Sequence, residues 1–270
     1  MKISVLGIVA GLCLTASTSH AIIIRHDTGP DRYEKRASEY PAVFFLEQQG
    51  SRKVCAATVI HRRWAITAAH CTEETMLGNT LDNKRRFAVE VGGQAREIDL
   101  MIIHPDYDQL SATDVDLALL RFRDERALPH PVPLQVQEDE MAQVVSILGW
   151  GFFGLGTSGR SYSDGRLRMA QNRISEASTR LRMVFDDPRE RAADSLELEG
   201  MPSLGDSGGP AFIADGNSYR LAGIAVGELE GESFTEETQG KYGAIAIYER
   251  ISQHIKWIET VVGSKLPFDS

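Results

Sequence analysis

Cysteine is scarce in this sequence, and long hydrophobic runs are absent after its first residues. Three cysteines in 270 residues exclude a small scaffold held together by many disulfides. Cys13 lies in an apolar stretch near the start, so Cys55 and Cys71 are the two that remain. No Cys-x-x-Cys or paired-histidine spacing accompanies them, which argues against a zinc site. The pair forms either one disulfide or two buried thiols, and we expect no metal and no other cofactor.

Basic residues are outnumbered by acidic ones. The sequence has 29 Lys and Arg against 38 Asp and Glu, a formal net charge of -9. This balance argues against the basic surface that nucleic-acid binding requires, so we expect no nucleic-acid partner. No segment beyond the first residues has the length and apolarity of a membrane helix, so we expect no membrane anchor. The oligomeric state stays open.

Residues 1–21 have the organisation of a secretory signal peptide. Lys2 supplies a positive start, and residues 5–14 form an apolar stretch that is too short to span a membrane. Small residues at Ser19 and Ala21 provide a cleavage site. The sequence therefore predicts one exported domain over residues 22–270, secreted or periplasmic, in a compartment where cysteine pairs form disulfides.

Short apolar runs separated by turn residues follow from residue 42 onward. Such a pattern is typical of an all-β barrel or sandwich. The runs cover 42–46, 56–60, 64–67, 87–91, 100–103 and 117–122, and then 143–148, 167–174, 183–185, 211–213, 219–226 and 242–248. Three prolines between 128 and 137 prevent a central strand there and indicate a linker between two halves.

Two further segments have their own patterns. Residues 149–165 are rich in Gly and Ser and indicate a surface loop. Near the C-terminus apolar residues recur at helical spacing, at Ile251, Ile255, Ile258 and Val262. This spacing predicts an amphipathic helix that docks on the body of the protein.

Three separate segments carry candidate catalytic side chains. Ser207 lies in the run Gly-Asp-Ser-Gly-Gly, His70 follows Thr-Ala-Ala, and Asp116 precedes Leu-Ala-Leu-Leu. A serine hydroxyl is a poor nucleophile unless an imidazole takes its proton and a carboxylate orients the imidazole. Each segment alone also suits a turn or a structural role. Together they predict a nucleophilic serine in an exported protein.

The order His, Asp, Ser and the flanking residues resemble the chymotrypsin/trypsin-like serine proteases. The resemblance covers most of the chain from about Pro41 to Ile258. It includes His104-Pro105-Asp106-Tyr107, Gly149-Trp150-Gly151, Tyr248 and Trp257-Ile258. It implies two antiparallel six-stranded β-barrels with a C-terminal helix and an active site in the cleft between the barrels. The implied function is a secreted serine endopeptidase that hydrolyses peptide bonds of protein or peptide substrates through an acyl-enzyme.

The resemblance assigns roles residue by residue. Ser207 is expected to be the nucleophile, His70 the general base and then the general acid, and Asp116 the carboxylate that orients the imidazole. Asp114 is a rival, because it shares a face with Asp116 in an extended segment; Asp116 is preferred because it directly precedes the apolar run. The N–H groups of Gly205 and Ser207 are expected to form the oxyanion hole.

The same resemblance implies a disulfide and an activation pair. Cys55 and Cys71 are expected to form the disulfide that fastens the histidine loop. A freed apolar N-terminus is expected to insert beside Asp206, and cleavage after Ala21 would expose Ile22 for this purpose. Cleavage after Arg25, Arg32 or Arg36 is the alternative.

The expected specificity pocket is apolar. By the resemblance, Met201 stands at its floor, Val226 and Gly227 form the far wall, and Ala246 leaves it open. Because a thioether cannot neutralise a buried cation, we expect an apolar side chain before the scissile bond. Glu228, on the rim, could instead favour a basic side chain. Val226 also replaces a serine that in this family usually hydrogen-bonds the catalytic aspartate.

Two other functions are compatible with parts of the pattern. Gly-x-Ser-x-Gly also occurs in α/β-hydrolase esterases, whose Asp and His would be Asp215 and His254 here. Pro210 and an apolar run follow Ser207, however, where that class needs a helix. A protease homologue that only binds partners is the second alternative, although such proteins usually lose a member of the triad and none is lost here.

Overall fold

The computed structural model describes residues 22–111, 113–124, 129–229 and 239–263. The expected signal peptide of residues 1–21 lies outside the described residues, as do Leu128 at the start of the expected linker and residues 264–270 of the expected domain.

The first half of the chain forms a six-stranded antiparallel sheet in the order β2-β3-β4-β7-β6-β5. Its strands are β2 (Val43–Gln49), β3 (Arg52–His61), β4 (Trp64–Thr67), β5 (Phe87–Val91), β6 (Gln94–Ile103) and β7 (Ala118–Phe122). The two edge strands, β2 and β5, contact each other, so the sheet curls into a barrel. Two short helices, α1 (Cys71–Glu74) and α2 (Leu77–Asp82), connect β4 to β5.

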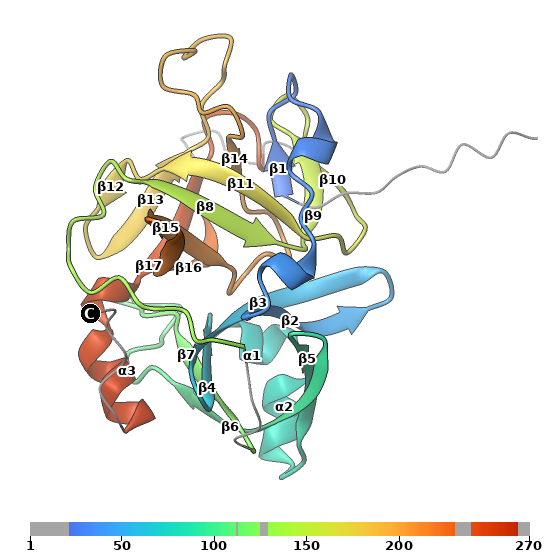
Figure 1. Cartoon of the computed structure of the whole chain (residues 1–270), viewed down its shortest axis with the longest axis vertical. Coiled ribbons are helices and arrows are strands. Elements are labelled where there is room, and N and C mark those ends of the chain that lie inside the picture. Colours follow the sequence, from blue (N-terminus) through green and yellow to red (C-terminus); the bar gives the residue numbers. More distant parts are fainter. Residues whose placement is uncertain (1–21, 112, 125–128, 230–238, 264–270) are drawn as a thin grey trace, which may run out of the picture.

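The second half forms a seven-stranded sheet in the order β11-β8-β15-β16-β17-β13-β12. Its strands are β8 (Val144–Gly149), β11 (Arg168–Arg173), β12 (Glu176–Ala177), β13 (Arg180–Val184), β15 (Pro210–Asp215), β16 (Ser218–Leu229) and β17 (Ile245–Arg250). Contacts between β11 and β13 curl this sheet as well. In Figure 1 the first sheet lies below the second, and the green segment between β7 and β8 connects them.

A small sheet in the order β10-β9-β1-β14 completes the second half. It contains β1 (Ile22–Ile24), β9 (Phe152–Leu155), β10 (Gly159–Ser163) and β14 (Gly200–Met201). β1 pairs parallel with β9 and antiparallel with β14. The expectation of a surface loop over 149–165 was therefore wrong for β9 and β10, because β9 pairs with β1 on one side and with β10 on the other, which the local sequence does not suggest.

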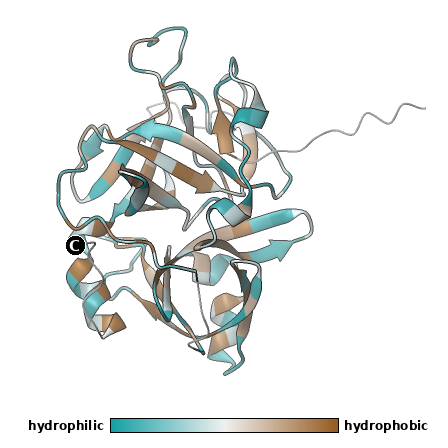
Figure 2. Ribbon diagram, viewed as in Figure 1, coloured by the Kyte–Doolittle hydropathy of each residue, from teal (hydrophilic) through white to brown (hydrophobic). Residues whose placement is uncertain are grey.

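The all-β architecture with two barrel-like sheets and a C-terminal helix is confirmed. The strand count differs in the second half, where the two-residue strand β12 extends the sheet to seven. Alternating side chains give a strand one inner and one outer face: in β5 Phe87, Val89 and Val91 are buried while Ala88 and Glu90 are exposed. Figure 2 shows hydrophobic and hydrophilic residues mixed along single strands in both sheets. One hydrophobic core fills the first sheet and continues between the two sheets, where Leu148, Phe212 and Leu221 of the second sheet join it. A second core lies within the second half.

Two segments tie the halves together. In the expected linker, the N–H of Val132 donates to the carbonyl of Val59 in the first sheet at 2.9 Å, and that of Gln135 donates to Leu221 in the second at 2.9 Å. After β17 and the 3-10 turn η3 (Ile251–Gln253), helix α3 (Ile255–Val262) returns to the first half (Figure 1). Ile258 joins the core of the first barrel there.

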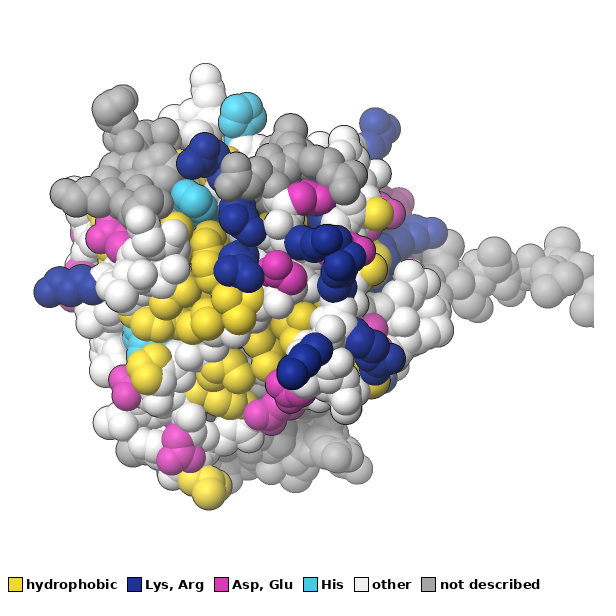
Figure 3. Space-filling view, turned by 90° about the horizontal axis from the view of Figure 1, so that it is seen from below, with side chains coloured by type: hydrophobic (Ala, Val, Ile, Leu, Met, Phe, Trp, Pro, Cys, Tyr) yellow, Lys and Arg dark blue, Asp and Glu magenta, His cyan; other side chains and the backbone are white. Residues whose placement is uncertain are grey.

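The face seen from below carries hydrophobic side chains in a central group, with Lys, Arg, Asp and Glu around it (Figure 3). The net negative charge is thus not gathered as one acidic patch on this face. Among the described residues, no helix has the length and apolarity needed to cross a membrane.

Candidate active site

The loop that carries Ser207 connects β14 to β15 and is held by main-chain hydrogen bonds on both sides. Ala56 in β3 donates to the carbonyl of Ser207 at 2.7 Å, and Gly208 donates to Ala225 in β16 at 2.7 Å. Gly208 has a φ of +75°, in the left-handed region that favours glycine. A Cβ at this position would overlap the carbonyl oxygen of Ala56 and the hydroxyl of Thr67.

The loop that carries His70 follows β4 and ends in helix α1. A disulfide joins Cys71, the next residue, to Cys55 in β3. The side-chain atoms of Cys55, His70 and Cys71 lie within 4.8 Å of one another. Because the two sulfurs are bonded together, they cannot serve as thiolate ligands, and this cluster is not a metal site. The disulfide instead fastens the histidine loop to the strand that also holds the serine loop.

Asp116 receives two hydrogen bonds from His70. The main-chain N–H of His70 donates to Asp116 Oδ1 at 2.8 Å, and His70 Nδ1 lies 2.5 Å from Asp116 Oδ2. Burial lowers the pKa of His70, but the hydrogen bond and charge of Asp116, together with the charges of Glu74 and Glu73, raise it, and the net pKa lies above 6.5. The geometry leaves Nε2 as the ring nitrogen available to a third group.

The rival carboxylate, Asp114, has other partners. Its Oδ2 lies 3.2 Å from a guanidinium nitrogen of Arg180, and its Oδ1 accepts the N–H of Asp108 at 2.7 Å. Asp215 and His254, the candidates for an esterase triad, also lie elsewhere: Asp215 pairs with Arg220, and the His254 ring packs on His104. Strand β15 begins at Pro210, only three positions after Ser207, whereas an α/β-hydrolase esterase needs a helix there.

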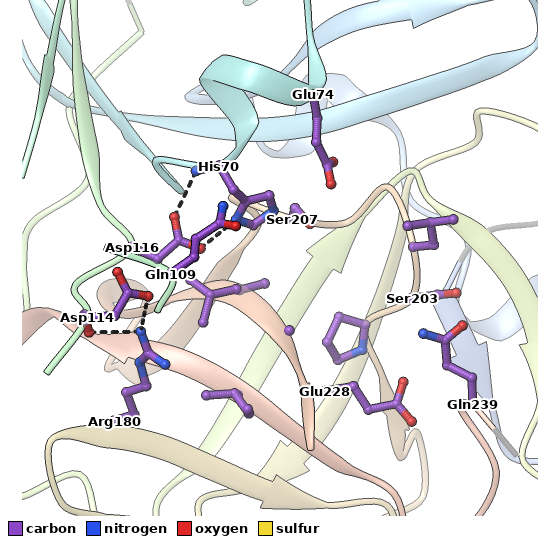
Figure 4. A pocket seen from close by; sticks show the side chains of 16 residues that line it. His70, Glu74, Gln109, Asp114, Asp116, Arg180, Ser203, Ser207, Glu228 and Gln239 are labelled. Carbon is purple, nitrogen blue, oxygen red and sulfur yellow. Dashed lines mark hydrogen bonds and ion pairs between the residues drawn. The ribbon is translucent and has the colours of Figure 1, made fainter. Parts of the chain in front are cut away.

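His70, Asp116 and Ser207 line one cavity of about 400 Å³ (Figure 4). Figure 4 shows Ser207 beside the His70 ring, with Asp116 on the other side of that ring. The remaining lining residues are Glu74, Gln109, Asp114, Arg180, Pro202, Ser203, Leu204, Ala225, Val226, Gly227, Glu228, Gln239 and Ile247. The structure thus brings together three side chains that are far apart in the sequence.

The pocket residues expected from the sequence divide into two groups. Val226 and Gly227 line the cavity. Met201 and Ala246 are not among its lining residues: Met201 is fully buried opposite Ile23, and Ala246 is packed in the second core. Pairing of β14 with β1 draws Met201 into the core, which the sequence around it does not reveal. Glu228 lines the cavity, and its Oε1 accepts the N–H of Gly240 at 2.8 Å.

Asp206 is buried beneath the serine loop, with 1% of its surface exposed. Its Oδ1 accepts the N–H of Gly151 at 2.6 Å and its Oδ2 accepts that of Ser203 at 2.9 Å. Burial raises the pKa of Asp206 to about 7, and these hydrogen bonds oppose the rise only in part. Ile22 is also buried, in strand β1 between β9 and β14. These two neighbouring strands adjoin the segments whose N–H groups hold Asp206.

The main-chain N–H groups of the serine loop differ in whether they have a hydrogen-bond acceptor. Those of Asp206, Gly208 and Gly209 donate to the carbonyls of Ser203, Ala225 and Asp206. For the N–H groups of Gly205 and Ser207, no acceptor is found within the described part of the chain.

Comparison with known proteins places this site in a family. The family model described as Trypsin matches residues 29–258. Granzyme E of Mus musculus is 30% identical over 188 residues, covering 67% of this chain and 73% of that protein. Chymotrypsin-like elastase family member 1 of Canis lupus familiaris is 24% identical over 244 residues, covering 86% and 91%. Vitamin K-dependent protein C of Mus musculus is 28% identical over 255 residues, and the chain spans about half of its length, 51%.

The structure of neuropsin, a serine protease expressed in the limbic system of mouse brain, aligns with a TM-score of 0.63 at 22% identity. The alignment covers 85% of this chain and 98% of neuropsin, and it shows the same fold. The chain belongs to the trypsin family of serine proteases, and its two barrel-like sheets are those of the chymotrypsin fold.

Gly208→Ala is expected to lower the free energy of unfolding by more than about 2 kcal/mol, because the methyl group meets immovable main chain at a positive φ. Chemical denaturation measures this change. Gly216→Ala is the matched control: its φ is +57° and nothing lies within 4 Å of its Cβ, so it should cost only about 1 kcal/mol. Equal losses in the two variants would contradict the packing argument.

Proposed function

We propose that the chain is a secreted serine endopeptidase in which Ser207 attacks the scissile carbonyl carbon. His70 Nε2 takes the serine proton and later protonates the leaving amine, while Asp116 holds the ring and stabilises its charged form. Water then hydrolyses the acyl-enzyme by the reverse proton transfers. The observation that carries this proposal is the His70–Asp116 hydrogen bond in the cavity that Ser207 also lines, in a member of the trypsin family.

The N–H groups of Gly205 and Ser207 are the proposed oxyanion hole. Negative charge develops on the carbonyl oxygen during attack, and two preorganised N–H groups stabilise it. Their neighbours in the loop already have acceptors, which supports this assignment of the remaining two. The φ of +96° at Gly205 sets the turn that orients its peptide group.

Ser207→Ala is expected to reduce kcat/KM for peptide hydrolysis by at least about 10³-fold, because the triad acts as a unit. It should also abolish labelling by a fluorophosphonate probe. Ser203→Ala, at another serine that lines the cavity, is the matched control and should retain labelling. An unlabelled parent protein with no Ser207-dependent turnover would favour the binding-only homologue.

Activity should fall at acid pH, because only neutral His70 accepts the serine proton. Since the pKa of His70 lies above 6.5, kcat/KM should drop as the pH falls through a value above 6.5.

We propose a second ionic requirement at the chain start: cleavage after Ala21 frees the Ile22 ammonium, which pairs with Asp206 and orders the loop of Gly205. The burial of both residues and the position of β1 support this pairing.

The pairing predicts how stability depends on pH. Consider the protein extended by Met-Ala before Ile22. The pKa of Asp206 is about 7 in its folded state and 3.8 in its unfolded state, so between these pH values the folded protein binds one proton more. Its contribution to the free energy of unfolding is therefore fully present below pH 3.8 and is lost as the pH rises through about 7. In protein that begins at Ile22, the ammonium keeps Asp206 ionised and this loss should shrink.

Denaturation curves of the two forms across this pH range measure the difference, at most about 1.4 kcal/mol per pH unit. Asp206→Asn in the extended form is the control, because it removes the titrating group. Parallel pH profiles in the extended and Ile22-initiated proteins would rule out the pairing.

The cavity suggests a specificity that differs from the sequence prediction. Met201 does not line the cavity, while Glu228, Ser203 and Gln239 do. A carboxylate inside a substrate cavity attracts a cation and repels an anion. We therefore propose that a basic side chain before the scissile bond is preferred, with Glu228 as its partner.

Glu228→Gln is expected to lower kcat/KM about tenfold for peptides with Arg or Lys at that position and to change it little for matched Leu peptides. Asp215→Asn, a charge removed far from the cavity, is the control for net charge. A parent enzyme that prefers Leu, Met, Phe or Tyr would instead support the apolar pocket expected from the sequence.

A further inference from the structure

A partly buried ionic cluster lies beside the His70–Asp116 pair and takes no part in the proposed proton transfers. Glu249 of β17 is buried, with 2% of its side chain exposed. Its Oε1 accepts the main-chain N–H of Asp116 at 2.9 Å and the Nε–H of Arg180 at 2.8 Å. Arg180, from β13, also donates to the carbonyl of Asp114 at 3.0 Å and to its carboxylate at 3.2 Å (Figure 4).

This cluster determines where the backbone of Asp116 sits. Both carboxylate oxygens of Asp116 are engaged by His70, one by the main-chain N–H and one by the ring. The depth and angle of that carboxylate therefore depend on its backbone, which Glu249 holds from the far side. Val226, which also lines the cavity, has an apolar side chain and therefore offers no side-chain hydrogen bond to this carboxylate.

The charges of the cluster compensate each other. Asp114, Asp116 and Glu249 are acidic, and Arg180 is the guanidinium that contacts two of them. Burial raises the pKa of Glu249, whereas the hydrogen bond from Arg180 lowers it. A buried ion pair is costly to break on one side, because the remaining charge is left uncompensated. Removing either partner should therefore change the electrostatic potential at Asp116 and His70, in opposite directions.

We propose that Glu249 and Arg180 are positioning residues for Asp116, fixing its backbone by a hydrogen bond and balancing the charge around it. The inference rests on the proposed triad, whose carboxylate they would hold. Glu249, from β17, does not line the cavity, whereas Arg180, from β13, lines its edge; both are proposed to act on the reaction through Asp116.

Other titratable groups lie near the ionic cluster and the His70–Asp116 pair. His70 faces Glu73 and Glu74 of α1 besides Asp116. His254 Nε2 lies 3.9 Å from Glu249 Oε2, and the His254 ring packs on His104, which faces Asp106. Burial, with the charges of His104 and Arg180, lowers the pKa of His254 to about 4, while the charge of Asp106 opposes this, so His254 stays neutral while His70 titrates.

The test compares Glu249→Gln, Arg180→Met and the double variant by the second-order rate constant for fluorophosphonate labelling of Ser207, measured from about pH 5 to about pH 9. The acid limb is the part of the pH profile where the labelling rate falls because His70 becomes protonated. Glu249→Gln leaves the positive charge of Arg180 in excess, which lowers the pKa of His70, and should move this limb down by about 0.5 pH units. Arg180→Met leaves the Glu249 charge in excess and should move the limb up by about the same amount. The double variant should return close to the parent.

Glu140→Gln is the matched control, because Glu140 is equally buried and pairs with the neighbouring Arg250 at 2.6 Å. It should lower stability without moving the acid limb. If one single variant does not fold, the other single variant against the double still decides. Acid limbs that coincide with the parent in every folded variant, or an equal shift in Glu140→Gln, would overturn the inference. A parent that is not labelled at Ser207 would instead overturn the proposed function.

Discussion

Two consecutive N–H groups of β3, those of Cys55 and Ala56, donate to the carbonyls of Gly205 and Ser207 at 3.1 and 2.7 Å. The same strand carries the disulfide to Cys71, immediately after His70. One strand of the first barrel thus holds both the histidine loop and the serine loop, although the serine loop belongs to the second half. The relative position of the proposed base and nucleophile depends on this strand more than on either loop, because the main-chain bonds and the disulfide leave little freedom between them.

Buried carboxylates support the two sides of the site in different ways. Asp206, under the serine loop, is held by main-chain N–H groups, and burial raises its pKa to about 7. Glu249, behind Asp116, is held by the guanidinium of Arg180. The first carboxylate forms no ion pair among the described residues, although the charge of Arg168 acts on it, and this leaves room for the proposed pairing with Ile22. The second has its cation built in, which suits a fixed support.

Much of the architecture follows from local pattern. The apolar run 87–91 predicts β5, whose bounds are Phe87–Val91, and the helical spacing from Ile251 predicts the amphipathic helix α3. Strands β9 and β14 were not predicted, because their pairing depends on β1 from the other end of the chain. Met201 illustrates the same limit: its position in the motif suggested a cavity residue, and strand pairing buries it instead.

By itself, the sequence determined the residue types and the order of the chemical groups: a serine in a glycine-rich turn, a histidine beside a cysteine, and an aspartate before an apolar strand. These features are local, since turn geometry and strand alternation depend on neighbouring residues. Only the tertiary structure decided that Asp116 rather than Asp114 contacts His70, that Glu228 rather than Met201 lines the cavity, and that Arg180 and Glu249 stand behind Asp116. Those contacts join residues from separate strands and loops, and their geometry is set by how the two curled sheets pack together.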